Sequence, residues 1–294
     1  MRQFLSPLWA KISRLRPDEV RVTAERPVSI GLHAFSAPGF AQMEEWLAPA
    51  SISDAKRWQV AGMIHRAGDP QAPSRFDVEL AVPGLARPGA IVFHPDDPRK
   101  TVAHVLAAQP ELQLALARHF APFREPVVDA LIHTVCKENT LFSLATALPD
   151  IIPNLIELPW ALAEFASDTA FITANQVRLA FQIAAASDHP VGYSHQKAAI
   201  ASIMGGAFGW RAVARQIVGK IPYGGGLIPK AAIAYGGTYL AGWGLERFYR
   251  VGYGYSATER RAVYDTGYAR GKEVALDLVR NLKRKKVEPA SVRL

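Results

Sequence analysis

Val28-Ser-Ile-Gly-Leu-His-Ala-Phe-Ser-Ala-Pro-Gly-Phe-Ala41 reads as a β-like run that feeds a glycine-containing turn and then a helix. Further short apolar runs follow at 76–82 and 91–94, helical runs are expected at 40–47 and 101–120, and proline and glycine cluster in the connecting loops. Alternating strands and helices indicate an α/β domain. We therefore predict a small α/β domain over residues 25–135.

The turn after the first strand stands where a nucleotide-binding protein has its phosphate-binding loop. Such a loop needs two glycines, a lysine that reaches the phosphates and a hydroxyl residue for Mg²⁺. In the best register Ala34 takes the first glycine position and Gly39 keeps the second. Phe40 then replaces the lysine and Ala41 the hydroxyl residue. The loop is therefore interpreted as degenerate, with no catalytic residue, no metal and no bound cofactor expected.

Two later strands fit the same interpretation. Phe76 to Gly84 resembles the GTPase strand that ends in Asp-x-x-Gly, but Ala81 stands where the Mg²⁺-side aspartate would be. The run from Ile91 resembles the guanine-reading strand, and there Asp97 alone matches. We predict a degenerate P-loop-like, GTPase-like α/β domain, with an unrelated small α/β domain as the alternative.

The second half, residues 136–294, consists of long Ala- and Leu-rich runs with prolines near their boundaries, which is typical of packed helices. Small residues recur at helical spacing on two of these runs, where they let helix backbones approach closely. These are Ala201, Gly205 and Gly209 on one run, and Ala234, Gly237 and Ala241 on the next. The fold class is thus α/β plus all-α, and aromatic residues along the second run fit either a membrane interface or a core.

Charge favours an anionic partner, because 34 Lys and Arg against 26 Asp and Glu give a net charge of +8. Residues 1–24 form a basic amphipathic segment that would lie on an anionic membrane or dock on its own domain. We take as candidate lipid contacts the basic residues near both ends: Arg2, Lys11, Arg14, Arg16, Lys283, Arg284, Lys285 and Lys286. Nucleic acid is the less favoured partner, because no single-sign stripe with stacking aromatics is evident.

The N-terminal apolar stretch is broken by Pro7 and Lys11 and lacks a signal-peptide pattern, so secretion is not expected. A single cysteine, Cys136, fits the cytosolic side. The uncharged run 231–245 is shorter than a bilayer span, which favours shallow insertion or a soluble helical bundle over a spanning helix.

Residues in the second half resemble the YcjF-like family, or domain of unknown function 697, over about residues 141–249. The resemblance rests on Ala145–Asp150, Asp168–Ala185 with its Asn175-Gln-Val sequence, Ala214–Pro222 and Ala231–Gly242. Its most specific part is the turn that begins Ile221-Pro-Tyr-Gly-Gly and the Ala-rich helix after it. It implies a hydrophobic helical domain without enzymatic residues, often attached to Era-like GTPases and membrane-associated. A GTPase or other protein partner, an anionic membrane and self-association are the expected partners.

These patterns together predict a non-catalytic membrane-associated or scaffolding protein. The alternatives are a GTPase with an unusual phosphate-binding loop and a basic nucleic-acid-binding protein.

The degenerate loop yields a prediction about nucleotides. Without the lysine and the hydroxyl residue, the charge-assisted contacts to phosphate and Mg²⁺ are lost. The purified protein should neither bind nor hydrolyse GTP or ATP in the presence of Mg²⁺. Calorimetric titration that gives an affinity on the order of 1 μM would contradict the interpretation.

Overall fold

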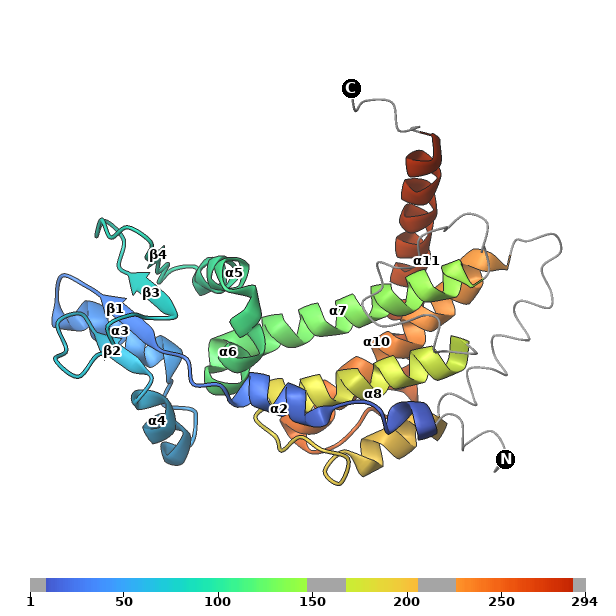
Figure 1. The fold of residues 1–294 in the computed structure, drawn as a ribbon, viewed down its shortest axis with the longest axis horizontal. Coiled ribbons are helices and arrows are strands. Elements are labelled where there is room, and N and C mark those ends of the chain that lie inside the picture. The colour runs from blue at the N-terminus through green and yellow to red at the C-terminus, as the bar shows by residue number, and fades with distance from the viewer. Residues whose placement is uncertain (1–8, 147–167, 206–225, 288–294) are drawn as a thin grey trace. The chain divides into compact units, whose positions relative to one another are not determined.

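The computed structural model describes residues 9–146, 168–205 and 226–287, which form two compact units (Figure 1). The α/β unit comprises Asp18–Asp129 and Ala185–Pro190. The helical unit comprises Met1–Pro17, Ala130–Ala184 and Val191–Leu294. An α/β part followed by a helical part is what the sequence predicts, and at this level the fold class is confirmed.

The α/β unit holds four strands and several short helices. Its strands are β1 (Ile30–His33), β2 (Ile64–Arg66), β3 (Val78–Ala81) and β4 (Ile91–Val92). Its helical elements are α2 (Pro17–Glu25), α3 (Ala37–Leu47), α4 (Asp54–Ala61), α5 (Pro98–Ala108), η1 (Pro110–Leu112), α6 (Gln113–His119) and the start of α7 (Ala121–Ala145). The strands at 28–32, 76–82 and 91–94 are thus found within one or two residues, whereas α2, α4 and β2 are additions to the predicted pattern.

The sheet is parallel throughout, in the order β2-β1-β3-β4, and β1 is buried along its whole length. Successive side chains of a strand point to opposite faces. Ile30 and Leu32 therefore share one face with Val78 and Leu80, and this face belongs to the core formed with α3, α5 and α6. On the other face Gly31 lies under the ring of Phe76, where an added Cβ would come within 2.5 Å of the ring. Glycine at this position is what lets Phe76 cover the centre of the sheet.

The helical unit is built from α7 beyond Asp129, most of α8 (Asp168–Ala186), a helix over 197–205, α10 (Leu227–Val251) and α11 (Ala257–Val287). Gly252, in a left-handed conformation with φ of +85°, ends α10. At the start of α11, Ser256 and Glu259 each accept a hydrogen bond from the other's backbone amide. This reciprocal pair is a capping box, which satisfies backbone amides at the start of the helix.

α10 and α11 pack at backbone distance through glycines. A Cβ added at Gly236 would lie 2.9 Å from the Tyr264 ring, and one at Gly267 would lie 2.8 Å from Cβ of Tyr239. At Gly271 it would meet Cβ of Tyr235 at 2.7 Å and the backbone of Ala232 at 3.0 Å. At these three positions between α10 and α11 there is room for the hydrogen of a glycine but not for a larger side chain.

A polar layer crosses the interior of the helical unit and joins α7, α8 and α10. Nδ2 of Asn139 donates to Oγ1 of Thr238 at 2.8 Å, and Nδ2 of Asn175 donates to Oδ1 of Asn139 at 2.9 Å. Asn175 also donates to Glu138, which pairs with Arg178. Because buried polar groups need specific partners, this layer fixes the register of the three helices.

In the part of the chain that the structure describes, no helix is both long and apolar enough to cross a bilayer.

Two glycine substitutions test the close packing of α10 and α11. Gly271→Ala should destabilise the protein by about 1 to 3 kcal/mol, because its methyl group meets fixed backbone atoms. Gly244→Ala in α10 is the matched control, since no described atom outside the immediate helix lies within 4 Å of its added Cβ. That change should stabilise by about 0.5 to 1 kcal/mol through helix propensity. Equal melting temperatures for the two variants would contradict the packing.

Candidate functional site

The loop after β1 is short and filled. β1 ends at His33 and α3 begins at Ala37, so three residues connect them. A Cβ added at Gly39 would lie 3.0 Å from Cβ of Ala34 and 3.3 Å from Cγ1 of Val82. Side chains therefore occupy the space beside Gly39, at the end of β1 where a phosphate-binding loop would wrap its ligand.

The other residues of the predicted nucleotide site lie in different surroundings. Phe40 packs on the core of the unit, and the guanidinium of Arg66 lies 5.6 Å from its ring centre. Ala41 lines a groove between α3 and α4. Ala81 is buried at the end of β3, and Gly84 adopts a φ of +84° that favours glycine. These environments account for the residue types by packing and turn geometry.

The structure describes the surroundings of most, but not all, of the residues predicted to pack the helices together. Ala234 and Gly237 are buried in α10, and Ala241 is partly buried. A Cβ added at Gly205 meets no atom within 4 Å in the described structure, and Gly209 lies outside the described residues. Contact between the two predicted stripes stays a prediction. Close helix contacts occur instead at four glycines outside the predicted stripes: Gly236 and Gly242 of α10, and Gly267 and Gly271 of α11.

The basic N-terminal segment docks on the helical unit through its apolar side. Ile12 is fully buried, and the Tyr193 hydroxyl lies 2.6 Å and 2.8 Å from the carbonyl oxygens of Ile12 and Leu15. Of the two interpretations left open by the sequence, the structure shows docking for the described residues from 9 onward. Arg14 and Arg16 stay at the surface, Lys11 is partly buried, and Arg2 lies outside the described residues. Lys283, Arg284, Lys285 and Lys286 continue α11, and their side chains lie outside the described set.

An exposed apolar surface with arginines lies where α10 turns into α11. We call residues 246–261 the α10–α11 corner. Phe248, Val251 and Tyr253 are 51%, 38% and 61% exposed there. The sequence of the corner contains four arginines and two glutamates. Aromatic and aliphatic side chains in water are therefore surrounded by a net positive charge.

Arg247 holds the turn of the corner in place. Its guanidinium lies 4.8 Å from the ring centre of Tyr255 and 5.3 Å from that of Tyr253, and it pairs with Glu259 at 3.2 Å. Arg250 pairs with Glu246 at 2.6 Å. Both glutamates are thus neutralised locally, while Arg260 and Arg261 are exposed in the first turns of α11, where Arg261 also pairs with Asp265 at 3.9 Å. The corner presents cations and apolar rings together.

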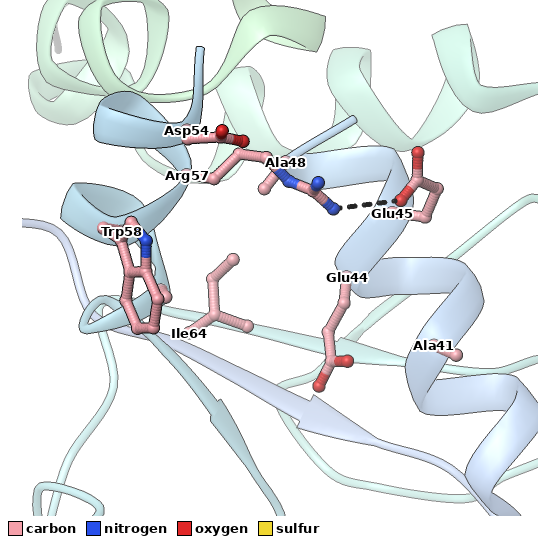
Figure 2. Close-up of a pocket in the computed structure, with 9 residues that line it drawn as sticks. Ala41, Glu44, Glu45, Ala48, Asp54, Arg57, Trp58 and Ile64 are labelled. Atoms are coloured by element: carbon pink, nitrogen blue, oxygen red, sulfur yellow. Dashed lines mark ion pairs between the residues drawn. The ribbon is translucent and has the colours of Figure 1, made fainter. Parts of the chain in front are cut away.

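A groove of about 700 Å³ lies between α3 and α4 in the α/β unit (Figure 2). Ile64 of β2 lies between the two helices, with Trp58 on one side and Glu44 on the other. Arg57 reaches across toward Glu45, with 3.7 Å between Nη2 and the carboxylate oxygen. The groove thus combines an indole ring with carboxylates.

Cations also gather around the turn Ala185–Pro190, where they are used structurally. Arg118 donates to the carbonyl oxygens of Ala185 and His189, and Arg124 donates to that of Ala186. Nζ of Lys56 lies 2.8 Å from the Asp188 carboxylate. These groups therefore cap the end of α8, where backbone carbonyls carry partial negative charge. They do not form an open anion site.

Cys136 is fully buried, and burial raises the pKa of its thiol well above the ordinary value. Its Sγ lies 3.6 Å from the carbonyl oxygen of Tyr235, whose hydroxyl bonds with Nδ1 of His133 at 2.7 Å. The thiol is therefore a packed core group and not a nucleophile.

No group of three or more metal-binding side chains occurs among the residues described. Comparison with known proteins finds no matching family model, no matching curated protein and no matching solved structure. The resemblance to the YcjF-like family stays a prediction.

Acidification should weaken the α/β unit through His119. Burial, together with the nearby positive charge of Lys56, lowers the pKa of this imidazole, while Nε2 bonds with the carbonyl of Arg26. The folded state prefers neutral His119, and the unfolded chain binds the proton more readily. Neutral His119 therefore contributes fully to the free energy of unfolding above the ordinary histidine pKa of about 6.5. This contribution is lost as the pH falls toward the lower pKa that His119 has in the folded protein.

The measurement is thermal melting at pH 7.5 and 5.5. His119→Gln should reduce the loss of stability on acidification, whereas His104→Gln, at an exposed position, should leave it unchanged. Identical pH dependence in the wild type and both variants would show that His119 does not carry the effect.

Proposed function

We propose that this protein has no catalytic activity of its own and associates peripherally with anionic membrane surfaces through the α10–α11 corner. The observation that carries the proposal is the exposure of Phe248, Val251 and Tyr253 beside four arginines. Aromatic and aliphatic side chains enter the headgroup region, while arginines pair with lipid phosphates at the same depth. A scaffolding role follows if the protein holds a partner at that surface.

The energetics favour a combined contact. Burying one Phe side chain contributes about 1.5 to 3 kcal/mol, and each cation near an anionic surface contributes about 1 kcal/mol. Neither contribution alone gives stable attachment. The basic stretch Lys283–Lys286 at the end of α11 adds four further charges to the chain's attraction for anionic lipid.

For the α/β unit we propose a degenerate nucleotide-binding fold that serves as a structural or interaction domain. Support comes from the parallel sheet and the β1–loop–α3 connection, with Ala34 and Val82 packed against Gly39. In open parallel sheets ligands bind beyond the carboxyl ends of the strands, where the strand order reverses, and in this order that point lies between β1 and β3. Packed side chains there favour a role without nucleotide.

Flotation of the full-length protein with vesicles tests the membrane proposal. The protein should float with vesicles that contain phosphatidylserine and not with phosphatidylcholine alone. Phe248→Ala combined with Tyr253→Ala should lower the partition coefficient at least about tenfold, because two apolar contacts are lost. Phe35→Ala is the matched control, since Phe35 is 71% exposed but belongs to the α/β unit.

Salt separates the two contributions to attachment. High salt screens the arginines and should release the wild-type protein in part. Complete release of the protein from the vesicles by salt would show that it only adsorbs electrostatically and that the aromatic rings do not insert, which would contradict the combined contact. Failure of the wild type to float with either vesicle, or equal flotation of the double variant, would refute the proposed membrane contact.

A further inference from the structure

The α3–α4 groove has a charge opposite to that of the chain as a whole. Its lining contains the carboxylates of Glu44, Glu45 and Asp54 and the guanidinium of Arg57, and Arg66 pairs with Glu44, so acids outnumber arginines by one. The whole chain carries +8. A local excess of acid on a basic protein selects for cations at that place, because cationic ligands are repelled elsewhere.

Trp58 gives the groove a second feature that suits a cation. Its side chain is 81% exposed, and its ring stands at one side of the open space above Ile64 (Figure 2). An indole face is the strongest aromatic partner for an ammonium or guanidinium group.

The carboxylates are held in place but are accessible. Glu44 forms a bidentate pair with Arg66, at 2.6 and 2.7 Å, and Arg66 is half exposed. Oε1 of Glu45 accepts a hydrogen bond from the amide of Ala50 at 2.8 Å. Exchange of a surface ion pair for an incoming cation costs little, because such pairs contribute about 0 to 1 kcal/mol.

The shape suits a long side chain attached to a polypeptide. Ala41, Ala48, Ala61 and Ile64 form the apolar part of the groove lining, which the aliphatic stem of a long side chain can cover. β2 is an edge strand that pairs with β1 alone in the described sheet, so its outer edge offers backbone groups to an extended segment. A free ammonium ion would use neither feature.

We propose that the α3–α4 groove binds a lysine or arginine side chain presented by a basic segment of a partner protein. The aliphatic stem lies along Ile64 and the alanine methyl groups. The cationic head lies between the ring of Trp58 and the carboxylate of Glu44. The proposal concerns the α/β unit and does not rest on membrane association.

Fluorescence anisotropy of labelled blocked peptides, with the full-length protein and without lipid, tests the groove. The probes are Gly-Ser peptides that carry three lysines, three arginines or three glutamates. The lysine and arginine peptides should bind saturably at protein concentrations below about 1 mM, and the glutamate peptide should not. Trp58→Ala should weaken binding about fivefold or more, and adding Glu44→Gln should weaken it further.

Control variants separate this site from other surfaces. Phe35→Ala, an exposed aromatic substitution in the same unit, and Phe248→Ala, in the α10–α11 corner, should leave peptide affinity unchanged. Equal binding of the lysine and glutamate peptides, no binding by the wild type, or wild-type affinity in a correctly folded Trp58→Ala protein would each overturn the proposal. If the protein binds the basic peptides but does not float with vesicles, the membrane proposal is refuted and the groove proposal stands.

Discussion

The close approach of α10 and α11 is the constraint on which the helical unit depends. Gly236, Gly267 and Gly271 bring two long helices to backbone distance, where any side chain would separate them. Glycine lowers helix propensity by about 1 kcal/mol per position, so the packed rings of Tyr235, Tyr239 and Tyr264 must offset that loss. The α10–α11 corner follows from this packing, because two helices held this closely leave room for a short turn with its side chains facing outward.

The polar layer adds a different kind of order. Apolar packing between helices tolerates small shifts, but Asn139 can satisfy its amide only where Thr238 and Asn175 lie opposite. Displacement of α10 by one turn would leave these groups buried without partners, at about 1 to 3 kcal/mol each. Glycines therefore set the distance between helices, and the polar layer sets their register. Small residues at helical spacing predict close packing at other positions, whereas isolated Asn and Thr residues have no distinctive spacing that would predict the polar layer.

Much of the fold was predictable where a periodic pattern is strong. β1 and β3 follow apolar runs, and the start of α11 follows a capping box. β2 was missed because Ile64-His-Arg66 has one apolar residue and becomes a strand by pairing with β1. The candidate site was harder still. Tyr235 is fully buried and Tyr253 is 61% exposed, yet both belong to one aromatic series in the sequence. Their difference arises from the turn at Gly252, which is a tertiary property.

The two proposed surfaces use exposed aromatic rings in opposite electrostatic settings. At the corner, Phe248 and Tyr253 lie among arginines, which suits an anionic surface. In the groove, Trp58 lies among carboxylates, which suits a cationic side chain. The groove repels anionic lipid phosphates, and the corner repels a basic peptide, so charge separates the two proposed ligands. A chain that binds both would concentrate a basic partner at an anionic membrane without any chemical step. Under the proposed scaffolding function, the opposite signs of the two surfaces keep each surface selective for its own ligand.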